Sequence, residues 1–272
     1  MRGSWVLLVG LLTSPAWAKG LPPLPDKIEL HVDARSAGAL HARALENFRE
    51  AFAPDRLEAM LADLAQGSKS IKGHTRTQLK DMRKQGVILR SAYVSLDARH
   101  EAPKALDSFV RVFGKLNDAI DNKMGDEIAR QAQRMQKLLG QDKLARLDGA
   151  LQGFRPASGA EFDRYVADAV KVLAGAVDHD ELPAKEFHEV RKSLKNLLAV
   201  AQLLEDSSTE TDQSHALYKH LFELNEQLGK AHDRLVRRDL RGKANYNRAT
   251  IGVPDWLKAS VTRLNEDLGE RP

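Results

Sequence analysis

Apolar residues recur at intervals of three and four along most of the chain, which is the pattern of helices with one buried face. Prolines and glycines interrupt this pattern and set the expected helix ends. Ser158 and Glu161 have the spacing of a capping box at the start of one helix. The pattern predicts helices at about residues 37–52, 55–64, 70–96, 104–122, 126–139, 142–151, 159–177, 183–204, 214–228 and from 254 onward.

No window alternates between apolar and polar residues with a period of two for long enough to indicate a strand. Aromatic residues make up only 6% of the chain, and alanine and leucine dominate its apolar set, which favours helices over sheets. The sequence therefore predicts an all-α fold. The expected architecture is two antiparallel helical bundles.

Two stretches that lie 115 residues apart carry the same charged landmarks at the same spacing. The first reads Arg76, Leu79, Lys80, Gly114, Lys115 and Asp118, and the second reads Arg191, Leu194, Lys195, Gly229, Lys230 and Asp233. In each stretch the arginine and the final aspartate are 42 residues apart, which indicates a tandem duplication. We expect one helical repeat at residues 37–154 and a second at residues 155–272, with a basic cleft between them.

The first 18 residues have the features of a secretory signal peptide. Arg2 gives the positive start, residues 5–12 are apolar, and Ala16-Trp17-Ala18 is a small-residue cleavage pattern. This apolar run is shorter than the roughly 20 residues that span a bilayer. We therefore expect cleavage after Ala18, an extended lead-in at residues 19–36, no membrane span in the mature chain, and a periplasmic or secreted protein. An uncleaved N-terminal anchor is the alternative.

The chain of 272 residues has no cysteine, so a fold in an oxidising compartment must depend on a hydrophobic core. The formal net charge is only +4, but the basic residues are concentrated. Residues 69–84 hold six basic residues and one acid, and residues 230–243 hold six basic residues and two acids. Such rows repel themselves unless something neutralises them, so they indicate a polyanionic partner. The alternative is a solvated charged face.

The positions of these charges on a helix define two stripes. In the first copy, four basic residues lie on one face: Arg76, Lys80, Arg83 and Arg90. In the second copy, Arg191 and Lys195 share a face with His188, but Leu198 takes the next position. A later segment compensates with basic residues at steps of three and four: Lys230, Arg234 and Arg237.

These motifs resemble the CHAD domain, the "conserved histidine α-helical domain". His188-Glu-Val-Arg191-Lys-Ser-Leu-Lys195 is similar to the basic helix of the family, and Leu228-Gly-Lys-Ala-His-Asp233 is similar to its second motif. Arg76-Thr-Gln-Leu-Lys80 and Phe113-Gly-Lys-Leu-Asn-Asp118 fit the same two segments in the first copy. The resemblance extends over about residues 37–265. It implies two pseudo-symmetric four-helix bundles around a basic channel that holds inorganic polyphosphate.

Phosphate chains are bound by forked arginine donors and mobile lysine charges, which suits basic residues at successive helical turns. The expected primary ligands are Arg76, Lys80, Arg83, Arg191 and Lys195, and the secondary ligands are Arg90, Lys115, Lys230, Arg234 and Arg237. His188 either donates to phosphate, more strongly when protonated, or is a packing histidine. We expect Asp118 and Asp233 to orient basic side chains or to cap helices.

Other functions have weaker support in the sequence. His215 and His220 are five residues apart, which is not the spacing that places two imidazoles on one helical face, so we expect no metal site. No nucleophile, phosphate-loop or dinucleotide motif is present. A magnesium site at Asp118, Asp121 and Glu127 would be needed for phosphoryl transfer. The basic rows lack interleaved aromatic residues, so we expect no specific nucleic-acid binding. The sequence predicts a non-catalytic binding module without a cofactor; a metal-binding or general interaction protein is the alternative.

Overall fold

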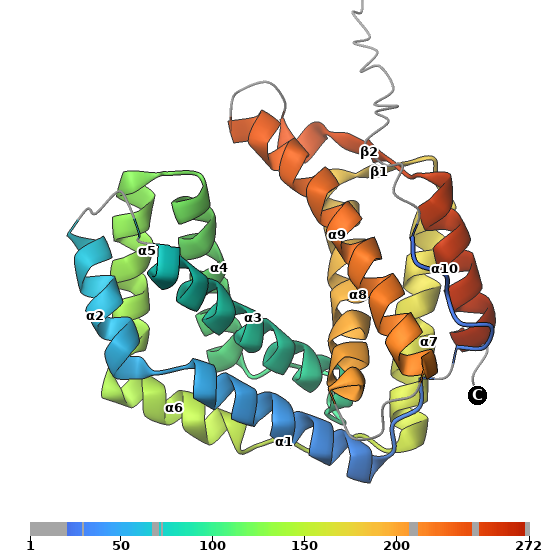
Figure 1. The fold of residues 1–272 in the computed structure, drawn as a ribbon, viewed down its shortest axis with the longest axis horizontal. Coiled ribbons are helices and arrows are strands. Elements are labelled where there is room, and N and C mark those ends of the chain that lie inside the picture. The colour runs from blue at the N-terminus through green and yellow to red at the C-terminus, as the bar shows by residue number, and fades with distance from the viewer. Residues whose placement is uncertain are drawn as a thin grey trace, which may run out of the picture.

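The computed structural model describes residues 21–28, 30–66, 71, 73–206, 212–240 and 245–269. The predicted all-α class is confirmed, because nearly all described elements are helices (Figure 1). The signal-peptide prediction at residues 1–18 lies outside the described residues. The same is true of four residues of the basic rows: Lys69, Lys72, Arg241 and Lys243.

The first half of the described chain contains six helices. Both consecutive helices and helices that are distant in the sequence pack together. The long α3 packs on α1 and α4, and α5 packs on both α2 and α4. Pro54 begins α2, as the sequence pattern predicts. The bounds are α1 Ala34–Ala51, α2 Pro54–Ala65, α3 Gly73–Leu96, α4 Lys104–Asp121, α5 Gly125–Leu138 and α6 Gln141–Leu151.

The second half of the described chain has four α-helices, in which α8 packs on α7 and α9 while α10 packs on α7. The capping box at the start of α7 is present, because Ser158 and Glu161 bond each other's backbone amides. The bounds are α7 Gly159–Val177, α8 Ala184–Glu205, α9 Asp212–Leu240 and α10 Asp255–Leu268. A short 3₁₀ helix, η2, spans Tyr246–Arg248.

Two details differ from the sequence prediction. A two-stranded antiparallel sheet forms between β1 (Glu181–Pro183) and β2 (Thr250–Gly252), and strands of three residues are too short to show a period of two. The helix expected at residues 214–228 continues through the basic segment to Leu240. Gly229 lies inside it without ending it.

The described part of the lead-in, at residues 21–28 and 30–33, packs on the second half. The amide of Ile28 donates to Asp267 of α10 (3.1 Å), and Nδ1 of His220 on α9 lies 2.6 Å from the carbonyl oxygen of Pro22. Ile28, Leu30 and Val32 are buried in the core. The lead-in is therefore part of the folded domain, and α1 begins at Ala34 where Asp33 caps it.

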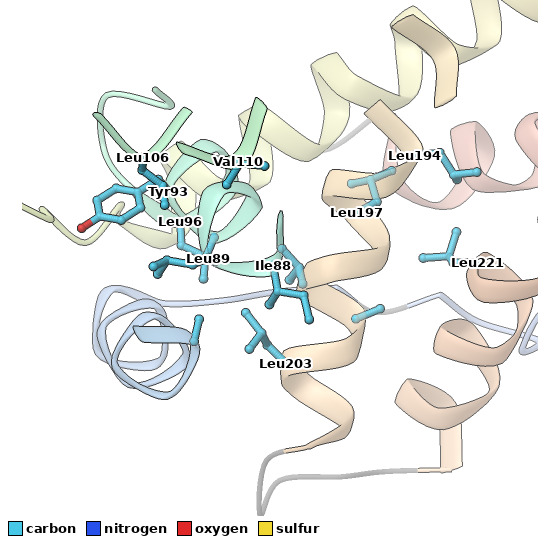
Figure 2. Packing of buried hydrophobic residues seen from close by; sticks show 14 of the residues in the cluster. Ile88, Leu89, Tyr93, Leu96, Leu106, Val110, Leu194, Leu197, Leu203 and Leu221 are labelled. Atoms are coloured by element: carbon cyan, nitrogen blue, oxygen red, sulfur yellow. The ribbon is translucent and has the colours of Figure 1, made fainter. Parts of the chain in front are cut away.

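One hydrophobic core runs through both halves. Helix α3 packs on α8, and Figure 2 shows Ile88 of α3 beside Leu203 of α8. A hydrogen bond of 2.9 Å from Ser91 to Asn196 joins the same two helices. Because α3 and α8 are the basic helices of the two halves, this contact fixes where their charged side chains lie relative to one another.

Candidate functional site

Each half places an arginine against the glycine of its Gly-Lys-x-x-Asp segment. A Cβ added to Gly114 of α4 would lie 3.7 Å from Nε and Nη2 of Arg83 on α3. A Cβ added to Gly229 of α9 would lie 2.9 Å from Nη2 of Arg191 on α8. The glycines therefore let a guanidinium group lie close to the neighbouring helix.

The arginine that lies against a motif glycine is Arg83 in α3 and Arg191 in α8. The equal spacing of 42 residues paired Arg76, not Arg83, with Arg191. If the two arginines are aligned, Lys80-Asp-Met-Arg83 is opposite His188-Glu-Val-Arg191. Seven residues complete almost two helical turns, so Arg76 and Arg83 share a face and the sequence alone does not distinguish them.

Six charged residues from four helices interact where the halves meet, and we call them the junction cluster: Arg83, Arg90, Asp118, Arg191, Lys195 and Asp233. The charge of Arg83 acts on both Arg191 and Lys195, and Asp118 interacts with Lys195 and Asp233. The structure thus brings four of the predicted ligands together from both halves. They carry four positive charges beside two carboxylates.

Lys195 and Arg191 are the two cations of this cluster whose pKa values are lowered. Burial, followed by the charges of Arg191, Arg83 and Arg90, lowers the pKa of Lys195 to about 8. Burial also lowers the pKa of Arg191, and its buried Nε has no hydrogen-bond acceptor among the described residues. An anion bound beside these cations would relieve the repulsion among them.

The stripe on α3 runs from solvent into this junction. Side-chain exposure is 49% at Arg76 and 48% at Lys80, and it falls to 39% at Arg83 and 24% at Arg90. Asp121 of α4 binds both outer residues, at 2.6 Å from Nη2 of Arg76 and 3.1 Å from Nζ of Lys80. Arg90 lies 3.5 Å from Asp107. Arg76 and Lys80 are therefore already paired, which makes them weaker candidates than the sequence suggested.

The two motif aspartates lie beside the arginines, as the sequence predicted. Asp118 is 3.9 Å from Nη1 of Arg83, and Asp233 interacts with Arg191. The surrounding protein raises the pKa of the Asp118 carboxyl, and the nearby carboxylates of Asp233 and Asp121 add to this effect. A hydrogen bond with His232 lowers the pKa of Asp233.

His188 lies at the edge of the cluster, with its ring centre 5.5 Å from that of His232 on α9. Burial, then the charges of His232, Arg191 and Lys195, lower its pKa below the usual value. His188 is therefore neutral at pH 7, so it can donate one hydrogen bond but adds no charge. His232 is held by the Tyr246 hydroxyl, 3.0 Å from its Nε2, a contact that the sequence did not reveal.

The remaining predicted ligands lie on α4 and α9 outside the cluster. Lys115 and Lys230 are exposed. Arg234 and Arg237 each donate from Nε to a backbone carbonyl one turn earlier, at 3.2 and 3.1 Å. Arg237 also interacts with Asp233, so it adjoins the junction cluster.

Several histidines have structural contacts. His41 stacks on Phe154 with ring centres 3.7 Å apart, and burial lowers its pKa to about 4. His215 pairs with Glu205. Among the described residues, no three histidine or acidic side chains are grouped as metal ligands. In the same part of the chain, no helix has the length and apolarity needed to cross a membrane.

Comparison with protein families matches residues 95–242 to the CHAD domain. The matched range includes both glycine-aspartate segments and the basic part of α8, whereas Arg76, Lys80, Arg83 and Arg90 precede it. No curated protein and no solved structure matches the chain. The match covers more than half of the sequence, and it is narrower than the range over which the motifs resemble the family.

Proposed function

Because the chain belongs to the CHAD domain family, we propose that it is a non-catalytic binding module for inorganic polyphosphate or a similar linear polyanion. One observation carries this proposal: Lys195 and Arg191 lie with Arg83 and Arg90 where two basic helices from different halves pack together. Four cations held together favour a ligand that is rich in negative charge.

A linear ligand is favoured over a single small anion because charged groups extend from both sides of the junction cluster. Arg76 and Lys80 continue the stripe along α3, and Arg237 continues it along α9. A chain of phosphates could contact the cluster at its centre and compete with Asp121 for the two outer cations. The ligand would then bridge the two halves.

We also propose a binding role without catalysis. The cluster offers fixed positive charges and hydrogen-bond donors, and its two carboxylates lie beside arginines. Carboxylates used in this way orient the cations and are less free to coordinate a metal for phosphoryl transfer.

The duplication and the export of the protein are part of the same proposal. We take residues 37–154 and 155–272 as two related halves, with α3–α4 equivalent to α8–α9. We also propose that residues 1–18 are a signal peptide cleaved after Ala18, which would deliver the protein to the periplasm or the exterior.

The test is a titration of the mature protein with long-chain polyphosphate, single-stranded DNA and heparin at two salt concentrations. We expect clear preference for polyphosphate, with affinity that falls as salt rises because binding releases counterions. Equal and weak binding of all three polymers would show that the basic surface has no selectivity.

The first prediction concerns Gly229. Gly229→Ala would place a methyl group 2.9 Å from Nη2 of Arg191, so the guanidinium must move. We expect polyphosphate affinity to fall up to about tenfold, the loss of one charged hydrogen bond. Gly114→Ala is the matched control, since its methyl group would make only an ordinary 3.7 Å contact with Arg83 and should change affinity less than about twofold.

Both variants replace glycine inside a helix by alanine, so neither should lower helix stability. Urea denaturation followed by circular dichroism checks this, and isothermal titration calorimetry measures affinity. Equal affinities for the two variants would contradict the assigned position of Arg191.

The second prediction concerns the pH dependence of binding. Because the pKa of Lys195 is lowered to about 8, its positive charge disappears as pH rises through that value. A bound polyanion favours the charged form, so affinity should fall about tenfold between pH 7 and pH 9.5. Lys195→Arg keeps a charge at both pH values and should show a much flatter profile by fluorescence anisotropy.

The stability of the unliganded protein changes with pH in the opposite direction to the affinity. A lysine with a lowered pKa in the folded state destabilises the unliganded protein below pH 8, and this cost is relieved as pH rises from 8 toward 10.5. A wild-type affinity that stays constant or increases over this range would contradict the assignment of Lys195 as a ligand.

A further inference from the structure

Four polar side chains join α3 of the first half to α7 and α8 of the second half, and we call them the hinge network: Ser91, Ser95, Tyr165 and Asn196. Oγ of Ser91 donates to Oδ1 of Asn196 at 2.9 Å. Oγ of Ser95 lies 3.3 Å from the hydroxyl oxygen of Tyr165, which also interacts with Asn196. Both serines are fully buried, so water does not compete for these bonds. The network therefore holds three helices in a defined arrangement.

The ring of Tyr165 is held as well as its hydroxyl. It stacks on His100, in the loop after α3, with ring centres 4.8 Å apart and an angle of 14° between the planes. The segment between the halves is attached to the same end of α3, because the amide of Ala157 donates to the carbonyl oxygen of Leu96 (2.9 Å). The C-terminal end of α3 is thus joined to the second half at several points.

Two members of the hinge network directly follow cations of the junction cluster. Ser91 follows Arg90 on α3, and Asn196 follows Lys195 on α8. The other basic ligand candidates of both helices precede these residues, toward the N-terminal ends. In Figure 1, α3 and α8 approach each other through their C-terminal parts and diverge toward their N-terminal ends. The network therefore lies where the two helices meet, and the basic stripes lie on the diverging parts.

A small rotation where the helices meet has a large effect on the outer cations. Arg76 precedes Ser91 by 15 residues, which is roughly 22 Å along a helix, so a rotation of about 10° would move it by roughly 4 Å. That displacement exceeds the length of a hydrogen bond. A polyanion that contacts both halves must fit the angle between α3 and α8, whereas a short anion held by one half does not depend on it.

We propose that Tyr165 and Asn196 are positioning residues of the polyanion site, because the hinge network sets the angle between α3 and α8 and thereby favours ligands long enough to bridge both halves. This preference for length rests on the proposed function. The network acts without touching the ligand. It holds the two basic stripes in the arrangement that a bridging ligand needs, so little rearrangement is required on binding.

The experiment removes two hydroxyl groups from the hinge network, in Tyr165→Phe with Ser91→Ala. The matched control is Tyr93→Phe with Ser260→Ala, which removes the same two kinds of hydroxyl group from buried side chains. Tyr93 and Ser260 donate to backbone carbonyls at 2.7 and 2.8 Å, and each of these bonds stays within one half. Isothermal titration calorimetry then measures the affinity of each variant for long-chain polyphosphate and for tripolyphosphate.

The hinge variant should lose about tenfold in affinity for long-chain polyphosphate and less than about twofold for tripolyphosphate. The ratio of the two affinities therefore falls at least about fivefold, while the control variant keeps the wild-type ratio. General destabilisation of a folded protein does not change this ratio, which is why it reports positioning. Tyr165→Phe alone, expected to lower the ratio about threefold, covers the case in which the double variant does not fold. An unchanged ratio in the folded hinge variant would overturn the proposal.

A distance measurement tests the hinge network without any ligand. Because the chain has no cysteine, Gln133→Cys on α5 and Thr262→Cys on α10 introduce one spin label in each half, at exposed positions. Double electron–electron resonance should give one narrow distance distribution for the otherwise wild-type chain and for the control variant. The hinge variant should give a broader or displaced distribution.

The two measurements separate failure of the hinge network from failure of the proposed function. If the wild-type protein does not bind polyphosphate, the proposed function is contradicted, and the distance distribution alone decides whether the network positions the two halves. A hinge variant with the wild-type distribution would overturn the positioning role. Polyphosphate binding by wild type together with equal affinity ratios in both variants would leave the proposed function intact and overturn the preference for length.

Discussion

Reversing the charge of both central arginines, in Arg83→Glu with Arg191→Glu, is expected to abolish measurable polyphosphate binding. The change removes one cation from each half and adds two carboxylates to the junction cluster. Each charged hydrogen bond contributes about 1.5 kcal/mol or more, and the added repulsion increases the loss. Affinity should fall by more than about 100-fold. Fluorescence anisotropy with labelled polyphosphate measures it.

A matched control makes the same change in net charge outside the junction cluster. Arg134 on α5 and Arg146 on α6 are exposed, so Arg134→Glu with Arg146→Glu tests general electrostatic attraction. We expect less than about a threefold loss, since neither residue belongs to the cluster and exposed charges are screened by salt. The milder pair Arg83→Gln with Arg191→Gln covers the case in which the glutamates disturb folding. Similar losses in the junction and control variants would contradict a localised site.

Removing the carboxylate of Asp97 should cause a large loss of stability. Asp97 is fully buried at the end of α3. It accepts hydrogen bonds from the backbone amides of Arg99 and Arg155 (both 2.9 Å) and from the guanidinium of Arg99 (2.8 Å). Asp97→Ala leaves these donors unpaired, so we expect the unfolding free energy to fall by about 3–5 kcal/mol. Urea denaturation at pH 7 measures it.

Asp97→Asn keeps the shape of the side chain but removes its negative charge, so comparing it with wild type measures how much that charge stabilises the fold. Burial would raise the pKa of Asp97, but the bonds from Arg99 and Arg155 outweigh this effect, so the pKa is lowered below 3.8. A lowered pKa means that the stabilisation is present at neutral pH and is lost as pH falls through the folded-state value. The advantage of wild type over Asp97→Asn should be constant from pH 5 to 7 and shrink below about pH 4. An advantage that persists unchanged at pH 2 would contradict this explanation.

The sequence predicts the helices well because their apolar spacing is regular and their ends carry strong local markers. Pro54 and the pair Ser158 and Glu161 occupy the expected positions at helix starts. The α9 helix is longer than predicted because Gly229, a residue that commonly ends helices, is here a contact surface for Arg191. The short sheet and the buried lead-in depend on contacts between distant residues, such as Ile28 with Asp267, which local patterns do not encode.

The sequence predicts a set of basic candidate residues, but it does not show which of them lie together in the fold. The basic stripe on α3 was found from helical geometry, but its outer members were ranked first. The structure places Arg83 against Gly114, whereas Arg76 is paired with Asp121 from α4. Because Arg76 and Arg83 are almost two turns apart, only the neighbouring helix reveals which of them approaches the second half. The low pKa of Lys195 also follows from packing between helices.

The most direct test follows the arginine side chains while short polyphosphate is added. In protein with ¹⁵N-labelled arginine, the Nε–H signals of Arg83 and Arg191 can be assigned with Arg83→Lys and Arg191→Lys. A ligand that bridges the halves should shift both signals along the same titration curve, while the signal of Arg146 stays in place. If only one of the two signals moves, or if neither does while others shift, the two halves do not bind one polyanion together.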